Sequence, residues 1–235
     1  MTPTIGTADA TASDIVLLSG RAAWIPVSRT LLVADLHLGK AATFRRAGIP
    51  VPEGTSARDL ARLAALVRDT GADRLLILGD LFHARGGCTE RVLSEFTAMR
   101  RSFPRTRVVL VPGNHDRAVG RLPRDVGLDA CEPTVHEPPF HFVHEPDTPP
   151  PADRGPCFTV AGHLHPTVSI RAPSGDRLTE RCFVAEEARL VMPAFGSFTG
   201  GERVTPREGL RLWIARDDGV VDVTRAALLA TRGRR

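Results

Sequence analysis

Residues 31–37 read Leu-Leu-Val-Ala-Asp-Leu-His, so a carboxylate and an imidazole directly follow a short apolar run. Two later stretches have the same form: residues 75–80 read Leu-Leu-Ile-Leu-Gly-Asp, and residues 108–116 read Val-Val-Leu-Val-Pro-Gly-Asn-His-Asp. A short apolar run bounded by polar or turn residues is typical of a strand buried on both faces of a sheet. The three runs therefore predict buried strands with polar residues at their carboxyl ends.

Two helices are expected between these strands. Within residues 56–70 the apolar positions recur at helical spacing, with Ser56 as the expected N-cap and Gly71 as the stop. Residues 89–101 are expected to form the second helix. Alternation of strand and helix predicts an α/β fold with a largely parallel sheet, in which ligands bind beyond the carboxyl ends of the strands. The polar residues should therefore converge on one site.

The second half of the chain predicts a second, mostly antiparallel sheet. Its expected strands lie at residues 140–144, 158–161, 167–170, 178–184, 190–192 and 210–214. Two short strands are also expected near the N-terminus, at residues 15–18 and 22–25. Residues 146–156 are rich in proline and predict a surface loop, and residues 1–13 are expected to be flexible. We expect a single domain over residues 1–235.

The composition is ordinary for a soluble globular protein, with 42% hydrophobic and 25% charged residues. No apolar run approaches the ~20 residues that span a bilayer, and the first residues lack a signal core, so we expect a cytoplasmic protein without a membrane partner. The net charge of +4 and the pI of about 9.3 mildly favour polyanionic partners such as nucleic acid. Four widely spaced cysteines predict unlinked, buried thiols.

Histidine, aspartate and asparagine gather in the segments that follow the predicted strands. The residues are Asp35, His37, Asp80, His83, Asn114, His115, Asp116, His144, His163 and His165. If the backbone is extended, the two polar residues of each Asp-x-His or His-x-His motif point to the same side. Mixed oxygen and imidazole ligands suit Mn²⁺, Fe²⁺ or Zn²⁺ rather than Ca²⁺, and the absence of cysteine ligands argues against a structural zinc site. A carboxylate can bridge two such ions, which supply hydroxide near neutral pH.

As a set, these motifs resemble those of the calcineurin-like metallophosphoesterases. The matching stretches are Asp35 with His37, Gly79 to His83, Gly113 to Asp116, His144, and Gly162 to His165. The resemblance implies a four-layer sandwich of two mixed β-sheets flanked by helices, with the metal site at the carboxyl ends of the strands. It also implies two divalent metal ions as cofactors, with Mn²⁺ as the first choice and Fe²⁺ or Zn²⁺ as alternatives.

The same resemblance assigns roles to individual residues. It implies one metal held by Asp35, His37, Asp80 and His165. It implies a second metal held by Asp80, Asn114, His144 and His163. Asp80 would bridge the pair, and metal-bound hydroxide would attack phosphorus. His115 would then protonate the leaving oxygen, with Asp116 as its orienting partner.

The lone histidine of the family pattern has three candidates, His136, His141 and His144. We prefer His144 because it ends the predicted strand 140–144, which is where a ligand belongs. His136 and His141 are then ordinary surface or half-buried histidines.

The chain resembles one branch of this family more closely. At the position of His83 many phosphatases carry aspartate. A branch of DNA-repair nucleases carries histidine there instead, and that histidine lies near the catalytic histidine and the phosphate. Residues 34–52, 76–85 and 192–201 resemble the DNA ligase-associated metallophosphoesterases. That resemblance implies nuclease-like phosphodiester hydrolysis, a role in DNA repair, and a functional association with a DNA ligase, a helicase and an exonuclease.

Several residues are candidates for substrate contact. Lys40, Phe44, Arg45 and Arg46 mix cations with an aromatic ring, as single-strand binders do; the alternative is a solvated loop with Phe44 in the core. Arg85 is either a phosphate contact or a solvated loop arginine, and Asn114 is expected to help bind phosphate. Residues 193–201, with Phe195 and Phe198, form either a wall of the site or a tight connection between strands.

Two other functions stay open. The same site could serve a phosphodiesterase for nucleotides or other small diesters, which a deep, narrow pocket would favour over an open basic groove. The chain could also be a non-catalytic subunit of a DNA-repair complex, although its full ligand set argues against that reading.

Overall fold

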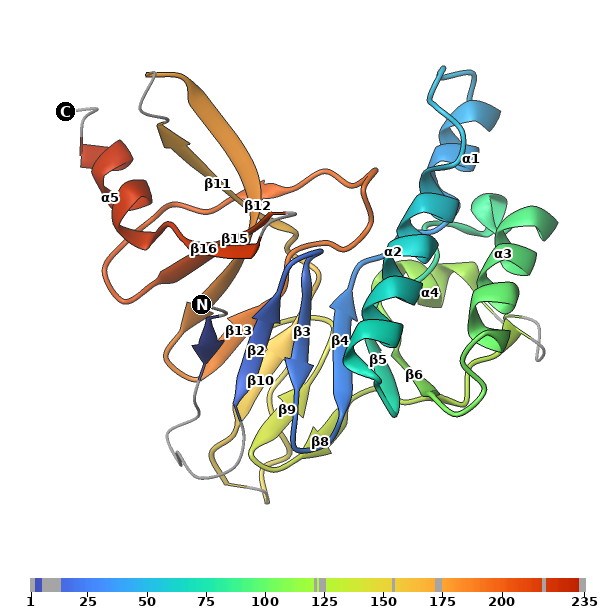
Figure 1. Ribbon diagram of the computed structural model, residues 1–235, viewed down its shortest axis with the longest axis horizontal. Coiled ribbons are helices and arrows are strands. Elements are labelled where there is room, and N and C mark those ends of the chain that lie inside the picture. The colour runs from blue at the N-terminus through green and yellow to red at the C-terminus, as the bar shows by residue number, and fades with distance from the viewer. Residues whose placement is uncertain are drawn as a thin grey trace.

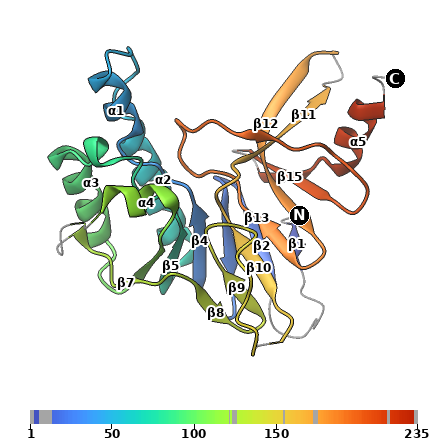
Figure 2. The same cartoon turned by 180° about the vertical axis from the view of Figure 1, so that it is seen from behind.

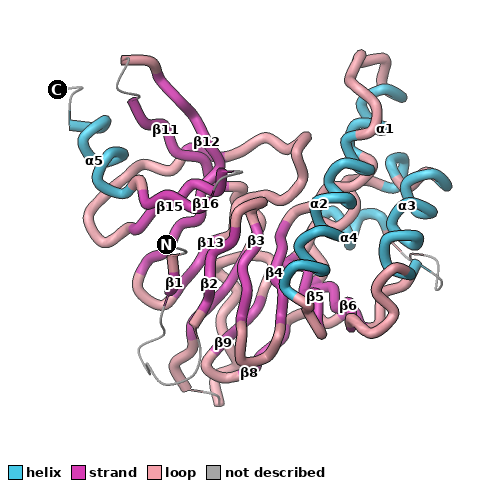
Figure 3. Tube along the Cα trace, viewed as in Figure 1, coloured by secondary structure: helices cyan, strands magenta, loops and turns pink. Residues whose placement is uncertain are grey.

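The computed structural model describes residues 3–5, 14–120, 122, 126–153, 155–171, 175–216 and 219–232 of the chain. Two β-sheets pack face to face, and most of the helices lie on the outer side of the first sheet (Figure 1). Figure 3 shows the same separation, with a helix at the far side of the second sheet. The architecture is therefore the expected one, two mixed sheets flanked by helices.

The first sheet has seven strands in chain order. They are β1 (Thr4–Ile5), β2 (Ile15–Leu18), β3 (Ala22–Ile25), β4 (Thr30–Ala34), β5 (Arg74–Leu78), β6 (Arg107–Val111) and β7 (Ala130–Cys131). Neighbouring strands from β1 to β4 are antiparallel, whereas those from β4 to β7 are parallel. The carboxyl ends of β4, β5 and β6 consequently meet at one edge of the sheet.

The second sheet is also mixed, with five antiparallel and three parallel pairings among the described strands. Its strands are β8 (Val135–Glu137), β9 (Phe140–Phe142), β10 (Phe158–Ala161), β11 (Pro166–Arg171), β12 (Arg177–Glu186), β13 (Arg189–Val191), β14 (Glu202–Arg203), β15 (Arg211–Arg216) and β16 (Gly219–Asp222). β9, β10 and β13 run parallel, so their carboxyl ends also meet.

The helices are α1 (Lys40–Arg46), α2 (Thr55–Thr70), α3 (Glu90–Arg101), α4 (Asn114–Val119) and α5 (Thr224–Arg232), with a 3-10 turn η1 at Arg85–Gly87. α2 and α3 cover the outer face of the first sheet through Leu63 and Phe96. α5 packs against β11 and β15 of the second sheet. None of the helices in the described ranges combines the length and apolar character needed to cross a membrane.

The apolar runs are continuous because both faces of the central strands are buried. In β4, Leu31 and Val33 face the helices, while Leu32 and Ala34 face the second sheet. β5 and β6 divide their side chains in the same way. An antiparallel sheet with one wet face would instead show alternation of apolar and polar residues. The first-half strands thus follow directly from the sequence pattern.

Some local predictions were incomplete or wrong. α1 and α4 were not predicted, because their short sequences are dominated by polar residues and glycine-bounded motifs. Ser56 does not cap α2: the N-cap is Gly54, and the Ser56 hydroxyl accepts the backbone N–H of Gly39. Residues 4–5 form β1, paired with β2, while residues 1–2 and 6–13 lie outside the described part.

The predictions of a loop at residues 146–156 and of unlinked thiols agree with the structure, but the predicted burial of the thiols does not. Residues 146–156, apart from residue 154, contain no helix or strand where the structure describes them. All four cysteines are free thiols, as expected. Only Cys182 is buried, however, and Cys131 is exposed at the edge strand β7, so the expectation of four buried thiols was wrong.

Candidate metal centre

The predicted ligands come from five separate segments that meet where the two sheets end. Asp35 and His37 follow β4, Asp80 follows β5, and Asn114 begins α4 after β6. His144 follows β9 and its backbone pairs with that of Gly162, which precedes His163 and His165. α1 and the β11–β12 hairpin both project beyond this end of the sheets, on opposite sides (Figures 1 and 2). The cluster therefore lies between these two projections.

One half of the cluster is formed by Asp35, His37, Asp80 and His165, whose ligand atoms all lie within 4.8 Å of one another. The Nε2 atoms of His37 and His165 are 3.2 Å apart. His37 Nε2 is 3.6 Å from Asp80 Oδ2, and His165 Nε2 is 3.5 Å from Asp35 Oδ1. Two imidazoles and two carboxylates directed at one point form a site for a cation.

The other half is formed by Asn114, His144 and His163. His144 Nε2 lies 3.1 Å from Asn114 Oδ1 and 3.0 Å from His163 Nδ1. The same Nε2 atom is 3.6 Å from Asp80 Oδ1. Asp80 thus presents one carboxylate oxygen to each half, which is the arrangement that a bridging ligand requires.

The ligand-bearing turns are left-handed rather than extended. Asp35, His37, Asp80, His163 and His165 have φ between 47° and 71°. They are five of the eight non-glycine residues with positive φ in the described part of the chain. Side chains disfavour this region, and such strain is concentrated at functional sites. Our assumption of an extended backbone at the Asp-x-His and His-x-His motifs was therefore wrong, although the side chains do converge.

Glycines leave the space that the ligands occupy. A Cβ atom on Gly79 would overlap the His144 ring, and the φ of Gly79 is +79°. A Cβ atom on Gly113 would overlap Asp80 Oδ1 and would come within 2.8 Å of His144 Nε2. Both glycines are thus required for packing of the ligands, and Gly79 is required for the turn as well.

The electrostatics of the cluster fit two divalent cations. Asp35 is fully buried, and its Oδ1 atom has no hydrogen-bond partner. Burial raises the pKa of Asp80, and the nearby Asp35 carboxylate raises it further against the opposing effect of His144. Burial, aided by His165, lowers the pKa of His37 to about 2, so this imidazole is neutral and can donate a lone pair. A buried carboxylate oxygen without a hydrogen-bond partner, such as Asp35 Oδ1, is costly unless a cation binds.

His115 and His83 lie beside the cluster. Their rings stack with centroids 4.8 Å apart and an interplanar angle of 28°. His115 Nδ1 lies 2.6 Å from the carbonyl oxygen of His83, and His115 Nε2 lies 4.0 Å from Asp80 Oδ2. Burial, together with the charge of Lys40, lowers the pKa of His83 to about 4. The hydrogen bond to the carbonyl leaves Nε2 of His115 as the nitrogen that faces the cluster.

Asp116 does not orient His115, contrary to our expectation. Its Oδ1 atom accepts the backbone N–H of Phe82 at 3.2 Å, and its Oδ2 atom accepts that of Gly113 at 3.0 Å. Asp116 therefore ties together the turns that carry Asp80 and Asn114. The His83 carbonyl takes the orienting role, which a reading based on side chains could not identify.

Of the cations predicted to contact substrate, Lys40 lies next to the cluster, whereas Arg45 is engaged elsewhere and Arg85 is exposed. Lys40 is partly buried, and its backbone N–H donates to the carbonyl oxygen of His37 at 3.2 Å, next to the cluster. Burial lowers the pKa of Lys40, although the Asp80 carboxylate raises it. Arg45 donates instead to the carbonyl oxygens of Val51 and Pro52. Arg85 is exposed at the start of η1. Contact of Lys40, Arg45 and Arg85 with substrate stays a prediction, and the geometry favours Lys40.

Two aromatic rings from distant segments meet beside His83. Phe44 of α1 contacts Phe198 edge to face, with ring centroids 5.5 Å apart, and its centroid is 6.3 Å from that of His83. Neither ring is fully buried. Phe195, in contrast, is fully buried in the core. Residues 193–201 thus contribute Phe198, but not Phe195, to the surroundings of the site.

The segment that carries Phe198 is held by buried polar residues that sequence analysis missed. Asp59 of α2 accepts hydrogen bonds from the backbone N–H and the hydroxyl of Ser197, at 2.8 and 3.0 Å. Arg62 lies 4.2 Å from the Phe195 ring centroid and donates to the Phe195 carbonyl. The only signal in the sequence was a carboxylate beside apolar helix positions, which also suits a solvated helix face.

The other two candidate histidines lie apart from the cluster. His136 of β8 and His141 of β9 are directly opposite each other in the strand register, and their ring centroids are 5.8 Å apart. His144 is the histidine of this region that contacts the ligands. The preference for His144 thus agrees with its position in the fold.

Comparisons with known proteins agree with this geometry. The sequence matches the family described as "Calcineurin-like phosphoesterase" over residues 28–186. The crystal structure of the nuclease MPE of Pseudomonas putida is similar, with 35% identity, 92% of this chain and 97% of that chain covered, and a TM-score of 0.75. A protein of unknown function from Aquifex aeolicus shares 19% identity over 58% of this chain and 78% of that chain, with a TM-score of 0.40. The curated proteins contain no significant match.

The matched family segment runs from β4 of the first sheet to β12 of the second and includes every predicted metal ligand. The similar nuclease structure extends the likeness over nearly the whole chain. This chain therefore belongs to the calcineurin-like phosphoesterase family, whose members are metal-dependent hydrolases.

Proposed function

We propose that this protein is a two-metal phosphodiesterase that cleaves nucleic acid, with His115 as the general acid. The observation that carries the proposal is the likeness, over 92% of the chain, to a protein that is itself a nuclease. The ligand cluster supports it, because buried carboxylates gathered with imidazoles at one point suit the binding of cations.

The two halves of the cluster define which residues would hold the ions. One ion would be bound by Asp35, His37, Asp80 and His165. The other would be bound by Asp80, Asn114, His144 and His163. We propose Mn²⁺, with Fe²⁺ or Zn²⁺ as alternatives, because mixed oxygen and imidazole ligands suit these ions. Bound there, the ions would lower the pKa of a bound water and neutralise charge on the phosphate.

The chain's own side chains would perform the remaining steps. The Asn114 amide and the Lys40 ammonium would bind phosphate oxygens, since Asn114 contacts His144 and the backbone of Lys40 contacts that of His37. His115 Nε2 would donate a proton to the leaving oxygen, and the Nδ1 hydrogen bond to the His83 carbonyl would hold the ring in position. The stacked His83 ring would limit rotation of the His115 ring.

The exposed side of the centre suits a polymer better than a small enclosed diester. The His115 side chain is 34% exposed, and that of His165 is 17% exposed, whereas the two carboxylates beneath them are buried. Phe44 and Phe198 place a pair of partly exposed rings next to His83. Unpaired bases stack on such rings, so the neighbourhood is suited to a single-stranded or distorted segment.

The finer functional assignments rest on resemblance alone. A role in DNA repair and an association with a ligase, a helicase and an exonuclease are carried by the likeness of residues 34–52, 76–85 and 192–201 to one branch of the family. The alternatives are a phosphodiesterase for small diesters and a non-catalytic subunit, and both are outcomes of the test.

The test is turnover of the Mn²⁺-loaded protein with single-stranded, nicked and duplex DNA, beside bis(p-nitrophenyl) phosphate as a small diester. We expect cleavage of DNA that is lost with EDTA and in the Asp80→Asn variant. Turnover of the small diester without cleavage of any nucleic acid would overturn the nucleic-acid assignment. No turnover of any diester with Mn²⁺, Fe²⁺ or Zn²⁺ would overturn the enzymatic one.

A further inference from the structure

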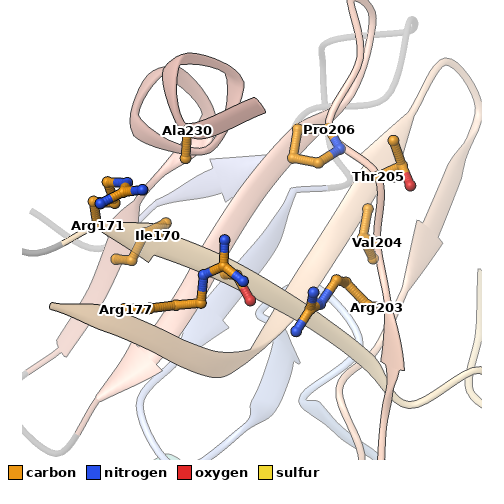
Figure 4. Close-up of a pocket in the computed structure, with 9 residues that line it drawn as sticks. Ile170, Arg171, Arg177, Arg203, Val204, Thr205, Pro206 and Ala230 are labelled. Atoms are coloured by element: carbon orange, nitrogen blue, oxygen red, sulfur yellow. The ribbon is translucent and has the colours of Figure 1, made fainter. Parts of the chain in front are cut away.

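A second site lies on the β11–β12 hairpin, away from the metal cluster. A pocket of about 190 Å³ is bounded by β11, the first residue of β12, residues 203–206 and α5 (Figure 4). Three arginines line it: Arg171 at the end of β11, Arg177 at the start of β12, and Arg203 of β14. Thr205 also lines the pocket, and among the described residues no carboxylate does so.

These arginines bring like charges together on neighbouring strands. Arg171 and Arg177 are directly opposite each other in the register of the hairpin. Like charges at opposed positions of an antiparallel pair destabilise it. Arg203 adds a third positive charge from the strand on the other side of β11. Arg171 donates one hydrogen bond, to the carbonyl oxygen of Gly175 at 3.5 Å, which offsets no charge. The three arginines make this pocket positively charged, which attracts an anion.

The hairpin connects this pocket directly to the metal centre. β11 begins at Pro166, immediately after the ligand His165. Arg203 belongs to the strand that pairs with Thr167, and Arg171 is six residues beyond His165. At about 3.3 Å per residue, Arg171 lies ~20 Å along the strand from that ligand, and Arg203 lies ~7 Å along it. The hairpin projects from the same end of the sheets as the cluster (Figures 1 and 2).

We propose that this pocket binds a backbone phosphate of a nucleic acid strand whose scissile phosphate lies at the metal centre. The inference rests on the proposed function, because it extends the substrate away from that centre. Guanidinium groups match phosphate oxygens in a forked, charge-assisted geometry. Spans of ~7 Å to Arg203 and ~20 Å to Arg171 correspond to about two to six nucleotides at the rise of B-form DNA, so a small diester with one phosphate cannot occupy both sites.

The test compares two triple variants that remove the same charge. The first is Arg171→Gln/Arg177→Gln/Arg203→Gln. The control is Arg68→Gln/Arg101→Gln/Arg105→Gln, because these three exposed arginines lie at the opposite end of the first sheet, near the starts of β5 and β6. Circular dichroism and thermal melting of both variants verify that the fold is retained.

For each protein, kcat/KM is measured with bis(p-nitrophenyl) phosphate, a dinucleotide and a 20-nucleotide DNA. We expect kcat/KM of the pocket variant to fall about tenfold or more with the 20-mer, because charge-assisted hydrogen bonds to the phosphate are lost. Its kcat/KM with the two short substrates should not change. The slope of log KM against log salt should fall by about 0.7–0.9, the contribution of one phosphate. The control variant should retain the wild-type values. Equal loss in both triple variants, or none in the pocket variant, overturns the proposal.

A binding measurement distinguishes a failure of this inference from a failure of the proposed function. Fluorescence anisotropy of a labelled 20-mer is measured in the His115→Ala background, with and without the three pocket substitutions. If no nucleic acid is cleaved yet the pocket substitutions weaken binding about tenfold or more, the site stands and the catalytic assignment fails. If DNA is cleaved and binding is unaffected, the pocket assignment fails and the function stands.

Discussion

The Nδ1 atom of His115 lies 2.6 Å from the main-chain carbonyl oxygen of His83, and the two rings stack with their centroids 4.8 Å apart. One residue therefore positions the other in two ways, through its backbone and through its side chain. Because the carbonyl does not depend on the side chain, the two contributions can be separated by substitution.

Replacement of His115 should remove proton donation and spare the metals. We expect His115→Ala to lower kcat by about 10²–10⁴-fold on a diester with a nucleoside leaving group. The loss should be much smaller with a p-nitrophenyl leaving group, which departs without protonation. Elemental analysis should give unchanged metal content. Equal losses on both leaving groups would contradict the role as general acid.

Replacement of His83 should act through the stacked ring. His83→Ala keeps the carbonyl but removes the stack, so we expect kcat to fall about tenfold while KM and metal content are retained, a modest share of the general-acid effect. His83→Phe preserves a stacking ring and should restore most of that loss. Stopped-assay kinetics on a dinucleotide measure both variants. If Phe and Ala behave alike, the imidazole itself takes part rather than its stacking surface.

Replacement of Asp80 should weaken the binding of both ions, whereas replacement of Asn114 should weaken the binding of one. Asp80 Oδ2 faces His37 and Asp80 Oδ1 faces His144, so Asp80→Asn should weaken binding of two metals. Asn114→Ala is the matched control, because Asn114 contacts only His144 within the ligand set. Metal titration followed by elemental analysis should give two ions lost for the first variant and one for the second. Full metal content in Asp80→Asn would rule out a bridge.

Gly113 should be intolerant of a methyl group for a purely steric reason. Its φ is not in the left-handed region, yet a Cβ atom there would overlap Asp80 Oδ1. We expect Gly113→Ala to lower metal affinity by about 10–100-fold, as for other disturbances next to a ligand. Gly200→Ala is the control, since nothing lies within 4 Å of the position that its methyl group would take and its φ is also not positive. Isothermal titration with Mn²⁺ compares them, and equal affinities would refute the steric argument.

The ion pair between Arg74 and Glu137 should make stability depend on pH. It joins β5 of the first sheet to β8 of the second through two contacts of 2.5 and 2.6 Å. The hydrogen bond from Arg74 holds the pKa of Glu137 below its ordinary value of 4.5. Since the folded pKa is the lower one, the stabilisation is complete above about pH 4.5 and is lost as the pH falls through the folded pKa.

The variant Glu137→Gln should therefore lose about 0.5–1 kcal/mol at pH 7, a small value because the Glu137 side chain is 47% exposed. The difference from wild type should shrink in acid. Urea unfolding of metal-free protein at pH 7 and near pH 3.5 measures it, with the exposed Glu132→Gln as control. A difference that is constant with pH would show that the pair contributes no charge-dependent stability.

Much of the fold could be read from local patterns. The runs at 31–34, 75–78 and 108–111 are continuous because helices cover one face of the strands and the second sheet covers the other. Apolar periodicity reports burial, and burial decides most of the secondary structure. α1 and α4 were not predicted because each is at most seven residues long, too short to show a helical pattern of apolar residues. Such short helices depend on the turns around them for their stability.

The sequence by itself predicted the residues that meet in the cluster, since residue type and position after a buried strand are local properties. Only the tertiary structure decided that the ligand-bearing turns are left-handed, that the His83 carbonyl rather than Asp116 orients His115, and that three arginines distant in sequence line one pocket. These features depend on backbone geometry and on contacts between segments far apart in the chain. No local sequence pattern predicts these three features, because the free energy that stabilises them comes from packing of the whole fold.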